Sequence, residues 1–178
     1  MEMTLRKATT ADAGAILELV NGLAADQIML PRSPASVIEN IRDFVIAEAD
    51  GEFAGCGALH VVWSHIAEIR SIAVPTGQRK TGLGRRMVEH MLAEAEALGI
   101  ARVFAFTYVP DFFQGLGFDV VEHASLPHKV FQDCLNCPKF QQCDEVAVER
   151  VLREIDDDPV RGPLSRPLPG VPLPIIGR

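Results

Sequence analysis

Short apolar runs and helical stretches alternate along the first half of the chain. Bounded apolar runs of this kind predict strands, and they occupy residues 3–8, 44–49, 53–62 and 66–74. Between the first two runs, apolar residues recur at helical spacing, which predicts two helices. Thr9 and Asp12 have the spacing of a capping box before the first helix, and Ser33 or Ser36 can cap the second.

The second half of the chain carries a longer helical pattern and then two more apolar runs. Apolar side chains recur at helical spacing over residues 83–98, and Gly99 marks the end of this helix. The almost wholly apolar run 103–106 predicts a strand buried on both faces. Residues 111–114 predict a short helix, and residues 118–122 predict a further strand.

Length and composition indicate one domain with a tail. The 178 residues are 48% apolar and 23% charged, as expected of a single enzyme domain. Residues 1–154 are expected to form this domain, with residues 123–154 as a cysteine-containing C-terminal segment. Residues 155–178 hold half of the 12 prolines and predict an extended tail.

Charge and hydropathy exclude two classes of partner. A formal net charge of −7 leaves no broad basic face for nucleic acid. No apolar run approaches the roughly 20 residues that span a bilayer, and the N-terminus MEMTLRKATT is not a secretory signal. Four cysteines without such a signal indicate a reducing, cytoplasmic setting. The expected partners are therefore small molecules, not nucleic acid and not a membrane.

One segment is strongly basic in this acidic chain. Residues 77–86, GQRKTGLGRR, hold three glycines and four cationic side chains, and residues 79–84 fit R-x-x-G-x-G between a strand and a helix. Glycines let backbone N–H groups face a ligand, and the helix that follows adds the positive end of its dipole, so the segment predicts a phosphate-sized anion site. A tight turn with solvated basic side chains is the competing interpretation. The spacing fits neither a P-loop nor a dinucleotide-binding fingerprint.

The order of elements around this segment resembles the GCN5-related N-acetyltransferase (GNAT) family over residues 3–122. The resemblance implies a fold of the α/β (α+β) class, with a mixed, twisted central sheet that is flanked by helices and splayed near Val74 to admit acetyl-CoA. It also implies that the R-x-x-G-x-G loop holds the pyrophosphate of coenzyme A, and that FFQGLGF, residues 112–118, lies beside the pantetheine arm. The chemistry of the family needs no metal.

The same resemblance implies a set of cofactor contacts. Backbone N–H groups of Ile72, Ala73 and Val74 match the positions that polarise the thioester carbonyl in the family. The remaining implied contacts are Arg79, Lys80, Thr81, Gly82, Leu83, Gly84, Arg85, Phe112 and Phe113.

The candidate catalytic groups are fewer. Family members transfer the acetyl group directly with both substrates bound, and AEIRSIAV resembles the AEI segment of GCN5 histone acetyltransferases, which makes Glu68 the candidate base. A salt bridge to Arg70, on the same strand face, is the alternative role for Glu68. Many members carry a tyrosine where this chain has Phe113, so Tyr108 becomes the candidate acid unless the thiolate leaves unassisted. Cys56, between two glycines, is expected to be a small core residue and not a nucleophile.

Several segments extend the resemblance to the acceptor. MLPRS, DFVIAEADGEFAGCGALH, RVFAFTYVPDFFQGLGF and SLPHK are similar to the acetyltransferase domain of bacterial N-acetylglutamate synthases, above all the short single-domain kind. The similarity implies L-glutamate as acceptor, in arginine biosynthesis, with Arg32, Arg70 and Lys129 binding its carboxylates. A solvated surface charge is the alternative for each of the three. The arginine-sensing kinase-like domain of the long synthases is not expected here, and family habit favours a homodimer.

Two other functions stay open at this stage. The acceptor can be another amine, such as a different amino acid, a polyamine or a protein N-terminus. An anionic acceptor needs Arg32 and Arg70 at the acceptor site, whereas a polyamine needs carboxylates there. Phe113 in place of tyrosine also allows a non-catalytic sensor of acyl-CoA or of an amino acid.

A cysteine cluster stands apart from these motifs. Cys134, Cys137 and Cys143 have the spacing C-x2-C-x5-C, and His123 or His128 can complete a zinc or iron–sulfur site. The fourth ligand is unassigned. The stronger expectation is therefore no metal, with reduced cysteines that pack a C-terminal helix or loop.

Overall fold

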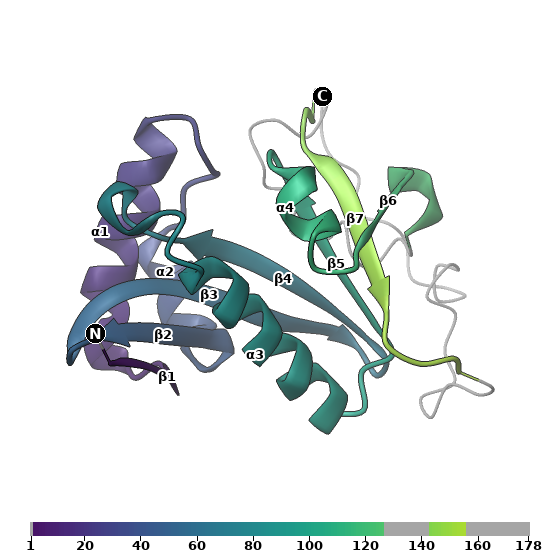
Figure 1. Cartoon of the computed structure of the whole chain (residues 1–178), viewed down its shortest axis with the longest axis horizontal. Coiled ribbons are helices and arrows are strands. Elements are labelled where there is room, and N and C mark those ends of the chain that lie inside the picture. Colours follow the sequence, from purple (N-terminus) through teal and green to yellow (C-terminus); the bar gives the residue numbers. More distant parts are fainter. Residues whose placement is uncertain (1, 127–142, 156–178) are drawn as a thin grey trace, which may run out of the picture.

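A mixed sheet of seven strands forms the centre of the molecule (Figure 1). The computed structural model describes residues 2–126 and 143–155. The strands lie in the order β1-β2-β3-β4-β5-β7-β6; β4 and β5 are parallel, and the other neighbouring pairs in the described chain are antiparallel. Their bounds are β1 Met3–Lys7, β2 Phe44–Ala49, β3 Glu52–Trp63, β4 Ile66–Ala73, β5 Arg102–Thr107, β6 Asp119–Val121 and β7 Val146–Val151.

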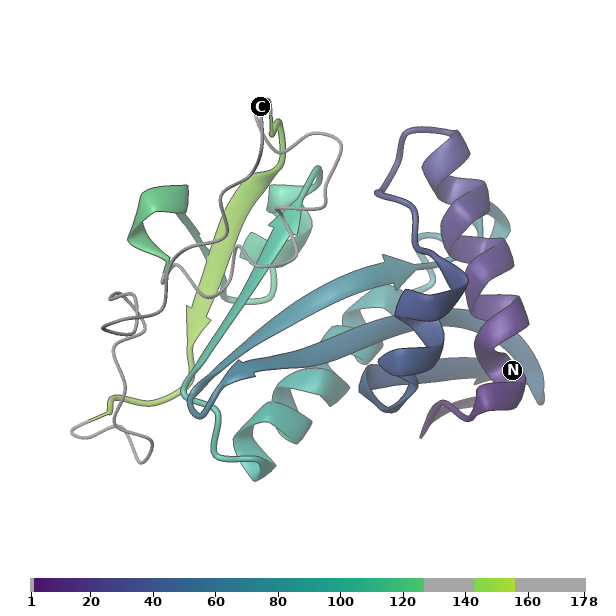
Figure 2. The same cartoon turned by 180° about the vertical axis from the view of Figure 1, so that it is seen from behind.

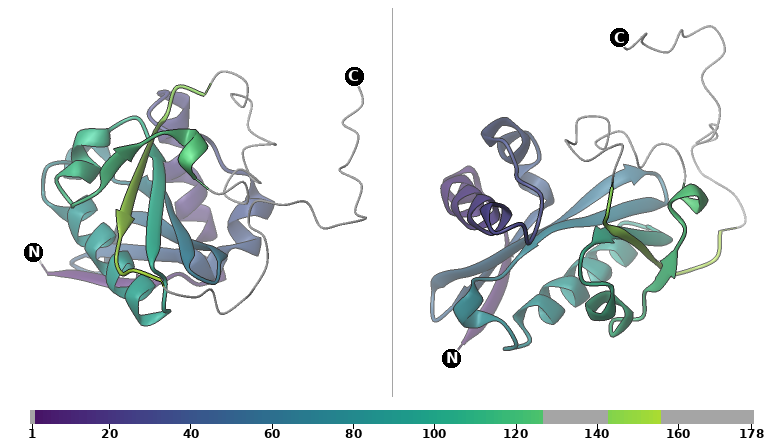
Figure 3. Two further views of the ribbon diagram at one scale, coloured as in Figure 1. Left: turned by 90° about the vertical axis from the view of Figure 1, so that its right-hand side faces the viewer. Right: turned by 90° about the horizontal axis from the view of Figure 1, so that it is seen from above.

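Helices cover both faces of this sheet (Figure 3). They are α1 Ala13–Ala25, α2 Pro34–Glu39, α3 Leu83–Ala97 and α4 Pro110–Gln114. On one face α1 and α2 pack over the sheet, and Ile16 and Val37 share a buried cluster with Cys56 of β3. On the other face lie α3 and α4, whose residues Met87 and Phe113 share a second cluster. The predicted mixed sheet flanked by helices is confirmed.

Local chemistry accounts for the helix ends. Ser33 caps α2, because its side-chain oxygen accepts the N–H of Ser36 at 3.1 Å. Gly99 follows α3 with a φ of 80°, a left-handed conformation that glycine adopts without strain. Within residues 2–126 and 143–155, no helix combines the length and apolar character needed to cross a membrane.

The two parallel strands separate soon after they meet. Their register pairs run from Ile66 opposite Arg102 to Glu68 opposite Phe104. Beyond that point the two strands diverge, as Figure 2 shows from behind. The predicted splaying of the sheet is therefore present, and it begins directly after Glu68. The edge of β4 that faces β5 has no partner strand over residues 69–73 in the described part of the chain.

One strand differs from the sequence-based expectation. No strand was predicted from the sequence in the C-terminal segment 123–154, but Val146–Val151 is strand β7, which lies between β5 and β6. It pairs with all six residues of β5, and Arg102 contacts Glu149 at 2.6 Å across the pair. The strand was missed because β7 joins the sheet through partners that lie far away in sequence.

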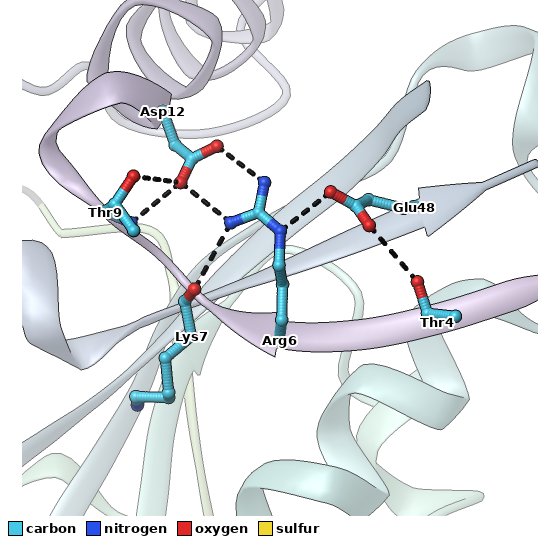
Figure 4. A network of polar contacts seen from close by, with 6 residues as sticks. All are labelled: Thr4, Arg6, Lys7, Thr9, Asp12 and Glu48. Carbon is cyan, nitrogen blue, oxygen red and sulfur yellow. Dashed lines mark hydrogen bonds and ion pairs between the residues drawn. The ribbon is translucent and has the colours of Figure 1, made fainter. Parts of the chain in front are cut away.

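A charged network fixes the N-terminal edge of the sheet (Figure 4). The Arg6 guanidinium donates to both carboxylate oxygens of Asp12, at 2.8 and 2.9 Å, and its Nε donates to Glu48 at 2.7 Å. Asp12 also accepts the Thr9 N–H at 2.7 Å, which closes the predicted capping box. The network thus joins β1, β2 and the start of α1. Hydrogen bonds from Arg6 hold the pKa of Asp12 well below its usual range.

We predict that Asp12→Asn lowers the free energy of unfolding at neutral pH by about 1–2 kcal/mol, because it removes a charged acceptor of several hydrogen bonds. The pKa of Asp12 is depressed in the folded protein relative to 3.8, so its stabilisation is present above pH 3.8 and is lost as pH falls below it. The stability difference between variant and wild type should therefore shrink in acid. Denaturant unfolding at neutral pH and at about pH 3 measures both quantities.

The matched control for that prediction is Asp26→Asn, at an exposed carboxylate for which no ion pair is recorded among the described residues. It should change stability little at either pH. A stability difference for Asp12→Asn that is the same at both pH values would contradict the assigned role of the network.

Candidate active site

The candidate site begins at an irregularity in β4. Between the pairs Ala58–Arg70 and Cys56–Ala73, two residues of β4, Ser71 and Ile72, lie opposite a single residue of β3. This is a β-bulge, and Ser71 has a φ of 55°, a left-handed conformation that costs a non-glycine residue about 1–2 kcal/mol. A strained residue at the open edge of a strand is typical of a functional site.

Strand β3 is shaped to receive the bulge. A Cβ on Gly55 would lie 2.9 Å from the carbonyl oxygen of Ala73, and a Cβ on Gly57 would lie 2.5 Å from Cδ1 of Ile72. Position 55 therefore needs glycine, because its clash is with backbone, whereas a Cβ at position 57 requires only that the end of the Ile72 side chain moves. Cys56 lies between them and is fully buried, and burial raises the pKa of its thiol to about 12. Such a thiol stays protonated at neutral pH, which agrees with a core role and not with nucleophilic catalysis.

The glycine segment follows β4 and leads into α3. Lys80 and Gly82 have φ values of 65° and 85°, and the first helical hydrogen bond runs from the Arg86 N–H to the Gly82 carbonyl oxygen at 3.1 Å. In the described part of the chain, the six N–H groups before it have no recorded backbone acceptor: Lys80, Thr81, Gly82, Leu83, Gly84 and Arg85. We call these six groups the amide cup. Consecutive unpaired N–H groups at the start of a 15-residue helix favour an anion.

The four cations of this segment have different surroundings. Arg79 and Lys80 are exposed, and no hydrogen bond or ion pair of either side chain is recorded among the described residues. In contrast, Arg85 donates to the Gly115 carbonyl oxygen at 2.8 Å and lies 3.2 Å from Glu89. The guanidinium of Arg86 donates to the Met3 carbonyl oxygen at 3.4 Å. Two cations thus tie α3 to neighbouring segments, and two are left at the amide cup.

The predicted aromatic element packs against the start of α3. Phe112 is half-buried, and its ring would lie 3.4 Å from a Cβ on Gly84, which is an ordinary van der Waals contact. Phe113 is buried in the core, edge-to-face with Phe112 and with Phe118, at centroid distances of 5.2 Å in both cases. A tyrosine hydroxyl at position 113 would thus lie among apolar groups.

The predicted acceptor residues meet on the face of β4 that α1 and α2 cover. Arg70 and Glu68 form an ion pair with Nη1 and Oε2 3.9 Å apart, and their side chains are only 8% and 13% exposed. Arg32, in the segment between α1 and α2, donates from Nε to the Ser71 hydroxyl at 3.0 Å. Arg32, Arg70 and Glu68 are therefore brought together around the bulge. Lys129 lies outside the described residues.

Sequence patterns did not single out a histidine beside Glu68. His60 of β3 lies directly opposite Glu68 in the sheet register, and its Nδ1 is 2.7 Å from Oδ2 of Asp43. The pair joins a strand to the turn before β2, so no short motif contains it. It adds a carboxylate–imidazole pair next to the candidate base.

The candidate acid has a carboxylate partner. The Tyr108 hydroxyl donates to Oδ1 of Asp144 at 2.8 Å, so it must give up this bond before it can protonate a leaving thiolate. Cys143 is exposed, while Cys134 and Cys137 lie outside the described residues. Over residues 2–126 and 143–155, no group of three or more histidine, cysteine or acidic side chains is arranged to hold a metal.

Comparison with known proteins gives the family. The model of the acetyltransferase (GNAT) family matches residues 23–118. The chain belongs to this family. This GNAT chain is 40% identical over 148 residues to an uncharacterised N-acetyltransferase of Chlorobaculum tepidum, which covers 83% of this chain and 96% of that protein. It is 36% identical over 132 residues to an amino-acid acetyltransferase of Mycobacterium tuberculosis, over 72% of this chain and 75% of that protein.

A solved structure extends the comparison to ligands. N-acetylglutamate synthase from Neisseria gonorrhoeae, complexed with coenzyme A and N-acetyl-glutamate, is similar to this chain with a TM-score of 0.78 and 27% identity. The match covers 86% of this chain and 36% of the synthase chain. The predicted GNAT fold and the predicted acetyl-CoA-dependent acetyltransferase are thereby confirmed.

The contact between Gly55 and β4 gives a prediction. In Gly55→Ala the new methyl group meets a backbone oxygen, so β4 must shift just beyond the bulge. We expect the free energy of unfolding to fall by about 1–3 kcal/mol and the affinity for acetyl-CoA to fall with it. Denaturant unfolding and calorimetric titration with acetyl-CoA measure the two effects.

Gly22→Ala is the control for Gly55→Ala. Gly22 lies within α1, and a Cβ there meets nothing within 4 Å. This variant should be as stable as wild type or up to about 1 kcal/mol more stable, because alanine favours helix. Wild-type stability and acetyl-CoA affinity in Gly55→Ala would show that β4 does not depend on the glycine.

Proposed function

We propose that this protein transfers the acetyl group of acetyl-CoA to the α-amine of L-glutamate, by direct transfer within a ternary complex. One observation carries the proposal: the amide cup follows the C-terminal end of β4, while Arg32, Arg70 and Glu68 meet on one face of the same strand. A donor and an anionic amine can thereby reach the same eight-residue strand.

The donor is held mainly by backbone groups. The amide cup binds the pyrophosphate of coenzyme A, with Arg79 and Lys80 as nearby charges. The pantetheine arm then runs between the diverging strands, where the unpaired edge of β4 offers hydrogen-bonding groups. The N–H groups that follow Ser71, on Ile72, Ala73 and Val74, are the candidates to stabilise the oxyanion of the thioester.

The acceptor is held by side chains on the face of β4 that α1 and α2 cover. Glutamate carries two carboxylates, and Arg32 and Arg70 supply two guanidinium groups suited to them. The names of the relatives agree with this class of substrate, since one is an amino-acid acetyltransferase and another is a synthase complexed with N-acetyl-glutamate. A polyamine is disfavoured as acceptor, because its positive charges would lie next to the guanidinium groups of Arg32 and Arg70 and be repelled by them.

The chemical step follows from these positions. Glu68 accepts a proton from the α-ammonium group, directly or through a water molecule, and the neutral amine attacks the thioester carbonyl. The new C–N bond forms, the nitrogen releases its second proton to solvent, and the C–S bond breaks. The coenzyme A thiolate then takes a proton from Tyr108 or from solvent. The ion pair with Arg70, whose Nη1 lies 3.9 Å from Oε2 of Glu68, keeps the Glu68 carboxylate beside the proposed acceptor ligands.

The deciding experiment measures coenzyme A release with a panel of acceptors: glutamate, aspartate, glutamine, leucine, spermidine and a peptide with a free N-terminus. We expect glutamate to give the highest kcat/KM, because it alone in the panel carries two carboxylates at this spacing. Release with spermidine alone would contradict the assignment of an anionic acceptor. Binding of acetyl-CoA without release for any acceptor would indicate a sensor.

We predict that Glu68→Gln lowers kcat by about 10²–10⁴-fold with little change in the KM for acetyl-CoA, since a general base contributes on that scale. The residual rate should rise with pH, because a larger fraction of the amine is then neutral without help. Rate measurements across pH for wild type and variant provide the check. A Glu68→Gln enzyme with a wild-type rate at neutral pH would leave Glu68 only its ion pair with Arg70.

A further inference from the structure

One side chain outside the predicted site holds the segment that carries Arg32. Asn21, on the last turns of α1, uses its amide group twice: Nδ2 donates to the Arg32 carbonyl oxygen at 3.0 Å, and Oδ1 accepts the Arg32 N–H at 2.9 Å. The amide group thus replaces the backbone partner that a neighbouring strand would give. In the described part of the chain, no backbone–backbone hydrogen bond is recorded for residues 29–31, which lead into Arg32.

The same arginine is also fixed at the end of its side chain. Its Nε donates to the Ser71 hydroxyl at 3.0 Å, and Ser71 is the left-handed residue of the bulge. Pro31 and Pro34 flank the segment and restrict its backbone further. Arg32 is therefore held at its backbone by α1 and at its guanidinium by β4.

We infer that Asn21 and Ser71 are positioning residues for the acceptor: together they hold Arg32 in place, so that the anionic group of the amine is tied to the bulge that precedes the thioester-binding amides. The inference rests on the proposed function of Arg32 as a carboxylate ligand. A preformed guanidinium loses less side-chain entropy when the acceptor binds, which lowers the KM for the acceptor. Occupation of Nε by Ser71 also fixes the plane of the guanidinium and so the direction from which a carboxylate can pair with it.

The Asn21 variants separate positioning from folding. Asn21→Ala should raise the KM for the acceptor about tenfold and leave the KM for acetyl-CoA within about twofold of wild type. Asn21→Asp keeps the acceptor for the Arg32 N–H but loses the donor, so its KM for the acceptor should lie between those of wild type and Asn21→Ala. Glu18→Ala is the matched control on the same helix, because Glu18 is exposed and no partner of it is recorded among the described residues; it should behave as wild type.

A double-mutant cycle tests whether Asn21 acts through Arg32. In the Arg32→Ala background, which already has weak acceptor binding, adding Asn21→Ala should change the acceptor KM by less than about twofold. If each substitution raises the acceptor KM by its own factor and the double variant shows the product of the two factors, the inference is overturned. An unchanged acceptor KM in Asn21→Ala alone would overturn it as well.

The Ser71 variants separate the hydroxyl from the backbone conformation. Ser71→Ala removes the hydroxyl and keeps the strain, whereas Ser71→Gly removes both, because glycine adopts positive φ freely. Equal increases in acceptor KM for the two variants would support a role of the hydroxyl. A wild-type acceptor KM in Ser71→Gly would overturn that role and leave only backbone geometry. Thermal unfolding of each variant shows that it is folded under assay conditions.

The acceptor panel keeps this inference distinct from the proposed function. If wild type uses another amino acid and not glutamate, the glutamate assignment fails, and the cycle run with that amino acid still tests Asn21 and Ser71. If wild type uses glutamate and the variants match it, the positioning role fails and the glutamate assignment stands. Turnover with spermidine alone would overturn both, because no anionic group would then need Arg32.

Discussion

Two strands that run parallel for three residue pairs and then diverge cannot satisfy each other's backbone groups beyond the last pair. In this chain each strand keeps an antiparallel partner on its outer edge, β3 beside β4 and β7 beside β5. The two halves of the sheet therefore stay intact while their inner edges separate. Over residues 2–126 and 143–155, the fold thus contains two strand edges with no partner strand between them, and the candidate site lies along these edges.

The bulge at Ser71 is the second consequence of that geometry. It inserts one residue into β4, so that Ile69 before it and Ile72 after it both pack toward the cluster of α3. The bulge needs room on β3, which Gly55 and Gly57 provide, and it needs a partner for a strained residue, which Arg32 provides. The backbone groups proposed for the donor and the side chains proposed for the acceptor thus meet at a single irregular residue.

The features that sequence reasoning predicted are those with local causes. Gly82 and Gly84 in the loop, Ser33 at a helix start and the charged pair Glu68–Arg70 can each be recognised within a few residues of chain. β7 was missed because its residues gain their role from β5, which precedes them by some forty positions. The bulge at Ser71 was missed for the same reason, since its sign in the sequence is a pair of glycines on another strand.

The charge of the basic segment shows a different limit of sequence reasoning. Four cations in ten residues suggested a site dominated by positive charge, but Arg85 and Arg86 are used to tie α3 to α4 and β1. What remains for an anion is mainly the amide cup. Oriented N–H groups hold a diphosphate without a large net positive charge, and they need no rearrangement when it arrives. A chain with a net charge of −7 can therefore offer a polyanionic cofactor a favourable site, because the favourable field is local and comes from the backbone.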